Sequence, residues 1–149
     1  MLPVETTFAS MSTQETPTLI AIVDDDGSVR SALEDMMQEA GFATFACASA
    51  EQFLDSARKG QTSCLITDIR MPGISGLELQ SRLNATRQRI PIIFITAHGD
   101  EDLRLQALRA GAVEFLAKPF DDALLLDGVR AALNHVRPMR SGASTEVFG

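Results

Sequence analysis

The stretch "CLITDIRMPG", from Cys64 to Gly73, decides how the chain can fold. An apolar run typical of a buried β-strand stops at one carboxylate, Asp68, and a turn-forming Pro-Gly pair follows at 72–73. A strand that is apolar on both faces belongs inside a parallel sheet, where an acid at its tip needs an explanation. Asp68 either caps the turn that Pro72 and Gly73 require or serves as a nucleophile.

Short apolar runs alternate with amphipathic helical patterns along the chain. This alternation predicts a (βα)5 α/β fold, a doubly wound parallel five-stranded sheet with helices on both faces. The runs at 19–23 and 91–96 are apolar throughout and suit central strands, whereas Thr44 and Glu114 lie in runs that suit the edges. That division matches the strand order 2-1-3-4-5. The expected strands are 19–23, 42–46, 64–67, 91–96 and 113–117.

A helical pattern follows each of these runs. The first carries apolar residues at helical spacing from Val29 to Ala40 and stops at Gly41. The second opens at "SAEQ" (49–52), which has the spacing of a capping box, and ends at Gly60. The remaining helices are expected after Ser75, over about 100–110, and from about 121 onward, where Leu126, Val129, Leu133 and Val136 form the apolar face.

The chain divides into a flexible N-terminal leader (1–17), one folded domain (18–136) and a C-terminal tail or start of a linker (137–149). The first ten residues lack the basic start and apolar centre of a signal peptide. The apolar runs are far shorter than the roughly 20 residues of a membrane-spanning helix. We therefore expect a cytoplasmic protein without membrane contact.

Composition narrows the function further. The net charge of −7 argues against direct nucleic-acid contact by this chain, because phosphates are neutralised by clustered Lys and Arg. Cys47 and Cys64 show no metal-ligand spacing, and Cys64 reads as a small core residue. The phosphate-binding patterns G-x-x-x-x-G-K-[ST] and G-x-G-x-x-G are absent from the sequence.

Acidic residues follow two of the strands that the order 2-1-3-4-5 brings side by side. Asp24, Asp25 and Asp26 follow the first strand, and Asp68 ends the third. Asp26 is explained as a helix cap, but three further carboxylates at one rim would repel one another. A divalent cation removes this repulsion, and an all-oxygen ligand set with room for water suits Mg²⁺. The pattern therefore favours a metal site over three unrelated turn residues.

Two more polar groups reach the same rim, Thr96 and Lys118. A carboxylate beside a metal can attack phosphorus, and the transferred oxygens need matching positive charge and donors. Lys118 can supply the charge, and the Thr96 hydroxyl with nearby backbone N–H groups can donate. Lys118 could instead be a surface lysine, but its apolar neighbours in "FLAKPF" argue against that. His98 could act as a base, although a lone histidine in a polar loop is usually only solvated.

Four motifs carry a resemblance to a known family: "IVDDDGSVR", "CLITDIRMPGISG", "FITAHGD" and "GAVEFLAKPF". In this order they resemble the receiver domain of bacterial two-component response regulators, which has the flavodoxin-like fold also found in CheY. The resemblance covers about 18–136. It is strongest to receivers of the nitrogen-fixation and LuxR-type branch of transcription factors.

The resemblance implies a Mg²⁺-dependent phosphoacceptor. Asp68 would accept a phosphoryl group from a sensor histidine kinase or a phosphotransfer protein. Asp25, Asp68 and the backbone carbonyl of Arg70 would ligate Mg²⁺, with Mn²⁺ as a substitute, and Asp24 would act on the metal through water. Lys118 would contact the phosphoryl group, and its bond to Pro119 is expected to be cis.

The resemblance also implies a conformational switch. Thr96 would move to hydrogen-bond the phosphoryl group, and Phe115 would change rotamer with it. The fourth helix, fifth strand and fifth helix would then form a homodimer or meet a target. Leucines that lie partly off the core stripes of their helices are candidates for that face, although local packing explains them equally well. Arg70 and His98 border the site and could set the phosphoryl lifetime. The leucines are Leu105, Leu108 and Leu124.

Three function classes remain open from the sequence. The first is a signalling switch, which catalyses only its own phosphorylation and dephosphorylation and is either a stand-alone receiver or a fragment of a longer regulator. The second is an unphosphorylated pseudo-receiver that acts as a docking module, although such proteins usually lose an acid or the lysine. The third is a phosphohydrolase of the haloacid dehalogenase type, whose D-x-D pattern would need an acid where this chain has Arg70.

Overall fold

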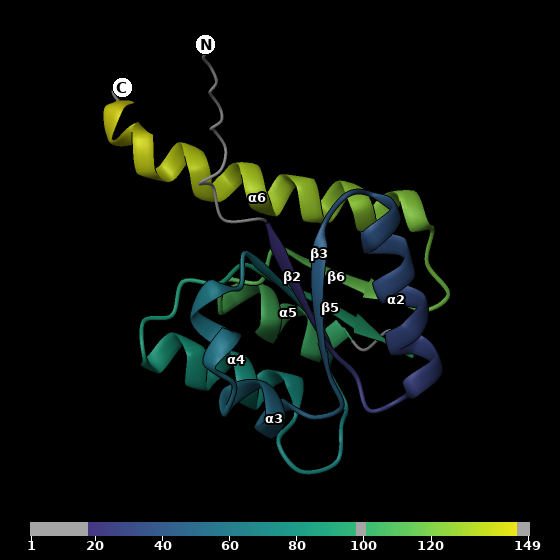
Figure 1. Ribbon diagram of the computed structural model, residues 1–149. Coiled ribbons are helices and arrows are strands. Elements are labelled where there is room, and N and C mark those ends of the chain that lie inside the picture. Colours follow the sequence, from purple (N-terminus) through teal and green to yellow (C-terminus); the bar gives the residue numbers. More distant parts are fainter. Residues whose placement is uncertain (1–17, 98–100, 146–149) are drawn as a thin grey trace.

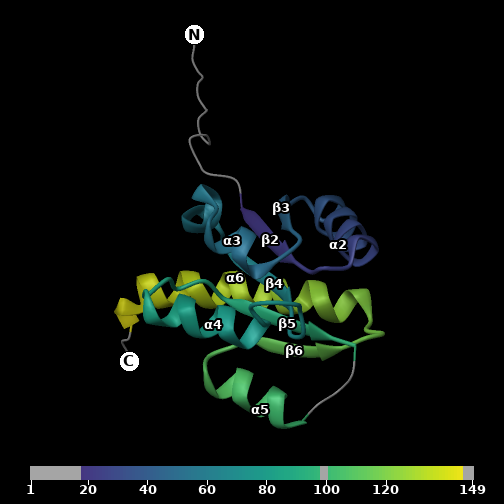
Figure 2. The ribbon, with the colours of Figure 1, turned by 90° about the horizontal axis from the view of Figure 1, so that it is seen from below.

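The fold is a single parallel sheet with helices on both faces. The computed structural model describes residues 18–97 and 101–145, with side chains as far as residue 134. Its five strands run in the order β3-β2-β4-β5-β6, and every neighbouring pair is parallel (Figures 1 and 2). This is the expected order 2-1-3-4-5. The strands are β2 (Leu19–Val23), β3 (Ala43–Cys47), β4 (Cys64–Asp68), β5 (Ile92–Thr96) and β6 (Glu114–Ala117).

The helices form two layers, one on each face of the sheet (Figure 1). One layer contains α2 (Gly27–Glu39) and α6 (Asp122–Thr145), whose buried side chains pack with Ile20, Ile22 and Ile66 of the central strands. The other layer contains α3 (Ala50–Leu54), α4 (Gly76–Ala85) and α5 (Glu101–Arg109). Since successive residues of one strand face opposite layers, both sets must be apolar, and the central strands read as continuous apolar runs.

Burial separates the central strands from the edge strands as expected. All residues of β2, β4 and β5 are buried, whereas β3 is mostly half-buried and β6 carries the exposed Glu114. Thr44 on β3 accepts a hydrogen bond from Gln38 and donates one to Glu34, both from α2. The polar interruptions in the sequence therefore mark edges, and the acid-tipped strand β4 lies in the centre of the sheet.

Three helices end with the same backbone motif, in which two N–H groups beyond the helix bond back into its last turn. At α2 the motif is centred on Gly41 (φ 97°) and at α5 on Gly111 (φ 107°). At α4 the equivalent left-handed residue is Arg87, with φ 61°. Glycine adopts this conformation without a Cβ penalty, and arginine does not.

Several expected boundaries shift, and two of the shifts have a clear physical cause. The strand expected at 42–46 begins at Ala43, because the Phe42 N–H donates to the Met37 carbonyl and belongs to the end of α2. The helix expected over 49–60 stops at Leu54, and a separate 3-10 helix occupies Ala57–Gln61. Ser56 interrupts the helix because its hydroxyl accepts from the N–H of Arg58 and caps a new turn.

The expected capping box at the start of α3 is only half formed. The Ser49 hydroxyl accepts from the Gln52 N–H, at 3.1 Å, as that motif requires. The reciprocal bond goes elsewhere, because Oε1 of Gln52 accepts from the N–H of Ala48 instead of that of Ser49. The helix start is therefore anchored one residue earlier than the motif predicts.

The last helix differs from its expected face and length. Leu125, Val129 and Ala132 are fully buried, while Leu126 and Leu133 are only partly buried, so the buried face lies about one residue toward the N-terminus of the expected one. α6 continues to Thr145 and passes the expected boundary at 136. The domain boundary itself stays a prediction, and the leader 1–17 lies outside the described residues. Among the helices that the structure describes, none has the length and apolar character needed to span a bilayer.

Candidate metal and phosphoryl site

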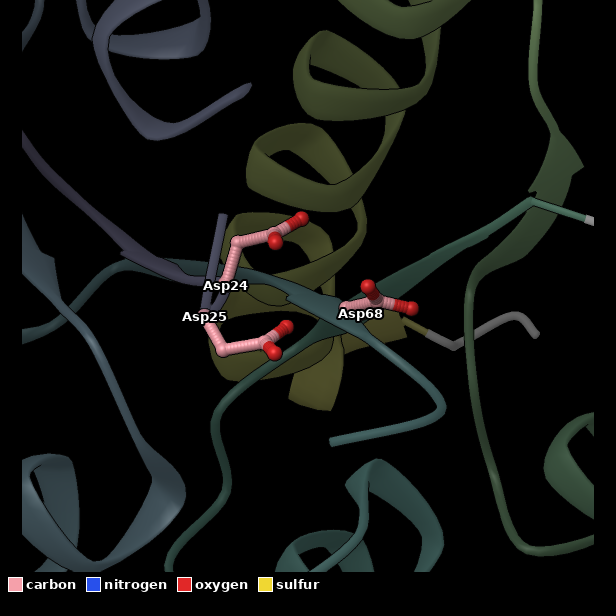
Figure 3. Close-up of side chains that lie close together, drawn as sticks. All are labelled: Asp24, Asp25 and Asp68. Atoms are coloured by element: carbon pink, nitrogen blue, oxygen red, sulfur yellow. The ribbon is translucent and has the colours of Figure 1, made fainter. Parts of the chain in front are cut away.

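Three carboxylates meet where the chain leaves the central strands. Asp24 and Asp25 directly follow β2, and Asp68 is the last residue of the neighbouring strand β4. One oxygen from each carboxylate lies within 4.8 Å of the others. Figure 3 shows the carboxylates of Asp24 and Asp25 turned toward the side on which Asp68 lies. This is the point where strand order reverses, and ligands of open α/β sheets bind there.

The backbone around Asp24 holds its carboxylate in one orientation. Its N–H donates to the Cys47 carbonyl at 3.2 Å, and Oδ1 accepts from the Asp26 N–H at 2.9 Å. Its own carbonyl accepts from Nη1 of Arg30 at 2.8 Å. The other carboxylate oxygen, Oδ2, is buried without a hydrogen-bond partner among the described residues and lies 3.6 Å from Nζ of Lys118. Oδ2 is thus an unused acceptor within the acidic cluster.

The electrostatics of Asp24 follow from this position. Burial raises the pKa of its carboxyl above the ordinary value of 3.8, and the neighbouring charges of Asp68 and Asp25 raise it further. The Asp26 N–H and the Lys118 ammonium lower the pKa, but the net shift is upward. The protein therefore holds an anion where an anion is unfavourable, and a bound cation would relieve this cost.

Asp68 is held from several sides but its carboxylate remains accessible. Oδ1 accepts from the N–H of Arg70 at 3.2 Å, and Oδ2 lies 3.8 Å from Nζ of Lys118. The Asp68 carbonyl accepts from the hydroxyl of Thr67. Gly76 at the start of α4 packs directly on this carbonyl, so closely that an added Cβ would lie 2.4 Å from the oxygen. The Asp68 side chain keeps 13% of its surface exposed, enough for a small reactant to reach it.

Lys118 lies between the two buried acids. Its Nζ is 3.6 Å from Asp24 Oδ2 and 3.8 Å from Asp68 Oδ2, and 24% of its side chain is exposed. Its backbone N–H donates to the Thr96 carbonyl at 2.7 Å, which ties it to the end of β5. The Lys118–Pro119 peptide bond is cis, as expected. The apolar surroundings noted in the sequence therefore lead to an inward-facing lysine.

Thr96 lies on β5, the strand beside that of Asp68, and Phe115 lies on β6, one strand further along the sheet. Asp68 pairs with Ile95, so Thr96 extends one residue beyond it at the end of β5, and its side chain is buried. Phe115 on β6 is buried and packs on Phe94, with ring centroids 6.2 Å apart. The other residues considered at this rim fall elsewhere. Asp26 caps α2, Arg70 is exposed, and His98 lies outside the described residues.

The donor set fits a hard divalent cation. The available ligands are carboxylate oxygens with exposed Asp25 at the mouth, which leaves room for water. Thiolate ligation does not compete, because burial raises the pKa of Cys47 to about 11 and that of Cys64 to about 12. The unpartnered Oδ2 of Asp24 supplies a buried acceptor that a metal-bound water can use.

Sequence reasoning missed three residues that shape the site: Arg30, Thr67 and Gly76. Arg30 lies near the start of α2, where the helix dipole disfavours a positive charge. An arginine at such a position indicates that its guanidinium has a specific hydrogen-bond acceptor. Gly76 begins α4 although glycine weakens helices, which signals a close approach. Nothing in the sequence distinguishes Thr67 from any other strand threonine.

Comparison with known proteins agrees with this geometry. The model of the response regulator receiver domain family matches residues 20–130. Nodulation protein W of Bradyrhizobium diazoefficiens is 42% identical over 130 residues, which cover 87% of this chain and 57% of the relative. The transcriptional regulatory protein FixJ of Azorhizobium caulinodans is 44% identical over 114 residues, which cover 76% of this chain and 54% of the relative.

A solved structure leads to the same family. The structure of the response regulator StyR superposes with a TM-score of 0.79 at 43% identity, covering 88% of this chain and 66% of that chain. The chain therefore belongs to the response regulator receiver domains of two-component systems. It spans a little over half the length of nodulation protein W and FixJ. The similarity to FixJ agrees with the nitrogen-fixation branch expected from the motifs.

Proposed function

We propose that Asp68 accepts a phosphoryl group from a histidine kinase or phosphotransfer protein and that the modified chain switches conformation to control a partner or output. The observation that supports this most strongly is the placement of Asp68, at the accessible rim within 4.8 Å of two more acids and 3.8 Å from the Lys118 ammonium. A carboxylate in this setting can act as a nucleophile, because a cation lies beside it to balance the charge and a reactant can approach it from solvent.

The transfer itself is a substitution at phosphorus. A carboxylate oxygen of Asp68 attacks the phosphorus of a phosphohistidine, the N–P bond breaks, and the freed imidazole takes up a proton from solvent. The product is an acyl phosphate. Its phosphoryl oxygens would lie against the ammonium of Lys118, which already faces Oδ2 of Asp68. Hydrolysis of the acyl phosphate returns the carboxylate, so the chain turns over no metabolite.

We infer that Asp25, Asp68 and the Arg70 carbonyl hold Mg²⁺, or Mn²⁺ in its place, with Asp24 acting through water. When bound, the ion neutralises the charge that gathers on the transferred oxygens. This assignment is supported by the oxygen-only ligand set and by the raised pKa of Asp24, whose anion is only partly compensated by Lys118. Lys118, which lies close to both Asp24 and Asp68, would then help to hold the carboxylates in position.

We further propose that Thr96 and Phe115 read the phosphorylation state. Thr96 is buried one residue beyond the pairing partner of Asp68, and Phe115 lies on the next strand. A hydrogen bond between the Thr96 hydroxyl and the phosphoryl group would favour one arrangement of this edge over another. The shift requires a differential interaction of a few kcal/mol between the two states.

The surface formed by α5, β6 and α6 is the proposed binding surface, through which a partner would respond to phosphorylation. Leu105 on α5 is 37% exposed and Leu124 on α6 is 55% exposed, whereas Leu108 is partly buried. We propose that this surface forms a homodimer or meets a target, within a cytoplasmic signalling unit formed by residues 18–136. Residues 137–149 would then act as a tail or the start of a linker.

Incubation with acetyl phosphate and Mg²⁺ tests the proposal, with intact mass as the readout. We expect one added phosphoryl group on the wild-type chain and none on Asp68→Ala or after addition of EDTA. An unmodified wild-type chain would contradict phosphorylation and favour a docking module. Sustained phosphate release from many phosphate esters would instead indicate a phosphohydrolase.

A further inference from the structure

The loop between Asp68 and α4 is anchored at its base and along its length. The Gly76 N–H donates to the Ile69 carbonyl at 2.9 Å, which closes the loop where it leaves the sheet. Met71 is buried against the core formed with α3 and α4. Arg70 lies between these points, and its carbonyl is one of the ligands proposed above for the metal. The loop continues from Met71 through Gly73 and Ile74 to α4, so a contact at Gly73 and Ile74 also restrains the turn that follows the Arg70 backbone.

Glu51 of α3 holds that part of the loop. Its Oε2 accepts from the N–H of Ile74 at 3.2 Å, across 23 residues of sequence. The same oxygen occupies the space beside Gly73, where an added Cβ would lie only 2.5 Å from it. Gly73 has a φ of 75°, a conformation that glycine adopts without strain. Both observations place the same carboxylate oxygen of Glu51 against the turn of this loop.

The segment that carries Glu51 also supports the other half of the acidic cluster. The carbonyl of Cys47, at the end of β3, accepts from the N–H of Asp24. Four residues later, the Glu51 side chain accepts from Ile74. One short segment, 47–51, therefore contacts both chain stretches that bear the proposed metal ligands, one through its backbone and one through a carboxylate.

We propose that Glu51 is a positioning residue for the metal site, which acts through the backbone of 70–74 without touching the ion. This inference rests on the proposed function, since it assumes that the Arg70 carbonyl is a ligand. The role requires a hydrogen-bond acceptor at this position and does not require a charge. Glutamine keeps a side-chain oxygen at the same distance from the backbone, so Glu51→Gln should preserve this role. Glu51→Ala removes the acceptor and should abolish it.

The test compares Glu51→Ala and Glu51→Gln with a control that loses the same charge, Glu39→Ala, at an exposed position of α2. The first readout is amide hydrogen exchange of Ile74 in EDTA, which needs neither metal nor phosphorylation. We expect about tenfold faster exchange in Glu51→Ala, because a typical hydrogen bond stabilises by about that factor, and little change in Glu51→Gln or the control. The second readout is the Mg²⁺ dissociation constant by calorimetry, expected to rise several-fold in Glu51→Ala alone.

The possible results separate failure of the Glu51 contact, of its positioning role and of the proposed function. Unchanged exchange at Ile74 in Glu51→Ala would overturn the contact. Faster exchange with the Mg²⁺ affinity of the control would leave the contact as local support only and overturn the positioning role. Loss of affinity in Glu51→Gln equal to that in Glu51→Ala would overturn the acceptor argument. A wild-type chain that binds no Mg²⁺ would overturn the proposed function itself and, with it, this role.

Discussion

Oδ2 of Asp24 lies 3.6 Å from Nζ of Lys118, inside ion-pair distance, yet this buried oxygen has no hydrogen-bond partner in the part of the chain that the structure describes. An ordinary structural salt bridge would use both groups fully, because leaving a buried charge partly unpaired is costly. Asp68 lies on the other side of the same ammonium, at 3.8 Å. The single charge of Lys118 therefore neutralises the two carboxylates only in part. This arrangement is expected of a site that binds a further cation.

The first prediction concerns Asp24→Asn in metal-free protein. Burial raises the pKa of Asp24 above 3.8, so the folded chain binds its proton more tightly than the unfolded chain does. Wild-type stability is then lost as pH rises from about 3.8 through the raised pKa, and asparagine avoids this loss. We expect the variant to be more stable than wild type at pH 7, because the folded protein disfavours the charged form of this carboxyl and asparagine carries no charge.

Urea unfolding in EDTA at neutral pH and again below pH 4 measures this difference, which should shrink at the lower pH. Asp35→Asn, an equally conservative change at an exposed site on α2, serves as the control and should alter stability little at either pH. If Asp24→Asn destabilised the metal-free protein at neutral pH, the acid would be acting as a structural partner of Lys118.

The second prediction concerns Gly76→Ala. In an unobstructed helix alanine is favoured over glycine by about 1 kcal/mol. Here the new Cβ would lie 2.4 Å from the Asp68 carbonyl oxygen and 2.9 Å from Cα of Ile69. We expect a loss of about 2 kcal/mol in the free energy of unfolding, because backbone atoms cannot move aside cheaply. Urea denaturation measures the loss.

Gly60→Ala is the matched control for this change, because a Cβ at Gly60 would meet nothing within 4 Å. That variant should be as stable as wild type or slightly more stable. Equal stability of Gly76→Ala and Gly60→Ala would mean that α4 does not press on the backbone of Asp68.

The third prediction concerns Arg87→Gly at the end of α4. Arg87 has a φ of 61°, which costs a residue with a Cβ roughly 1–2 kcal/mol. Glycine removes this strain but makes the unfolded chain more flexible, at a cost of about 0.5–1 kcal/mol. We expect a net gain of about 0.5–1 kcal/mol in the free energy of unfolding, measured by denaturant titration.

Gly111→Ala provides the opposite test, because Gly111 occupies the same place at the end of α5 with a φ of 107° and open space around it. It should lose stability through backbone strain alone. Stabilisation by Gly111→Ala, or destabilisation by Arg87→Gly, would disprove the common helix-ending motif.

Much of the fold and of the acidic cluster could be predicted because both depend on local patterns. The apolar runs give the sheet, and the strand order then brings Asp24, Asp25 and Asp68 together. The contact of Glu51 could not be predicted, since it depends on how a loop packs across 23 residues of sequence. The partner of Arg30 could not be predicted either, because it depends on how the chain turns between β2 and α2. The helix expected over 49–60 was wrong for a local reason, because Ser56 competes for the backbone N–H groups.

The most direct measurement of the central claim is to locate the phosphoryl group on the chain. After reaction with acetyl phosphate and Mg²⁺, borohydride reduces an acyl phosphate to an alcohol and leaves free carboxylates unchanged. Peptide mass mapping should then find homoserine at position 68 and intact aspartate at positions 24 and 25. Reduction at Asp24 or Asp25, or at no aspartate, would contradict the assignment of Asp68 as the phosphoacceptor.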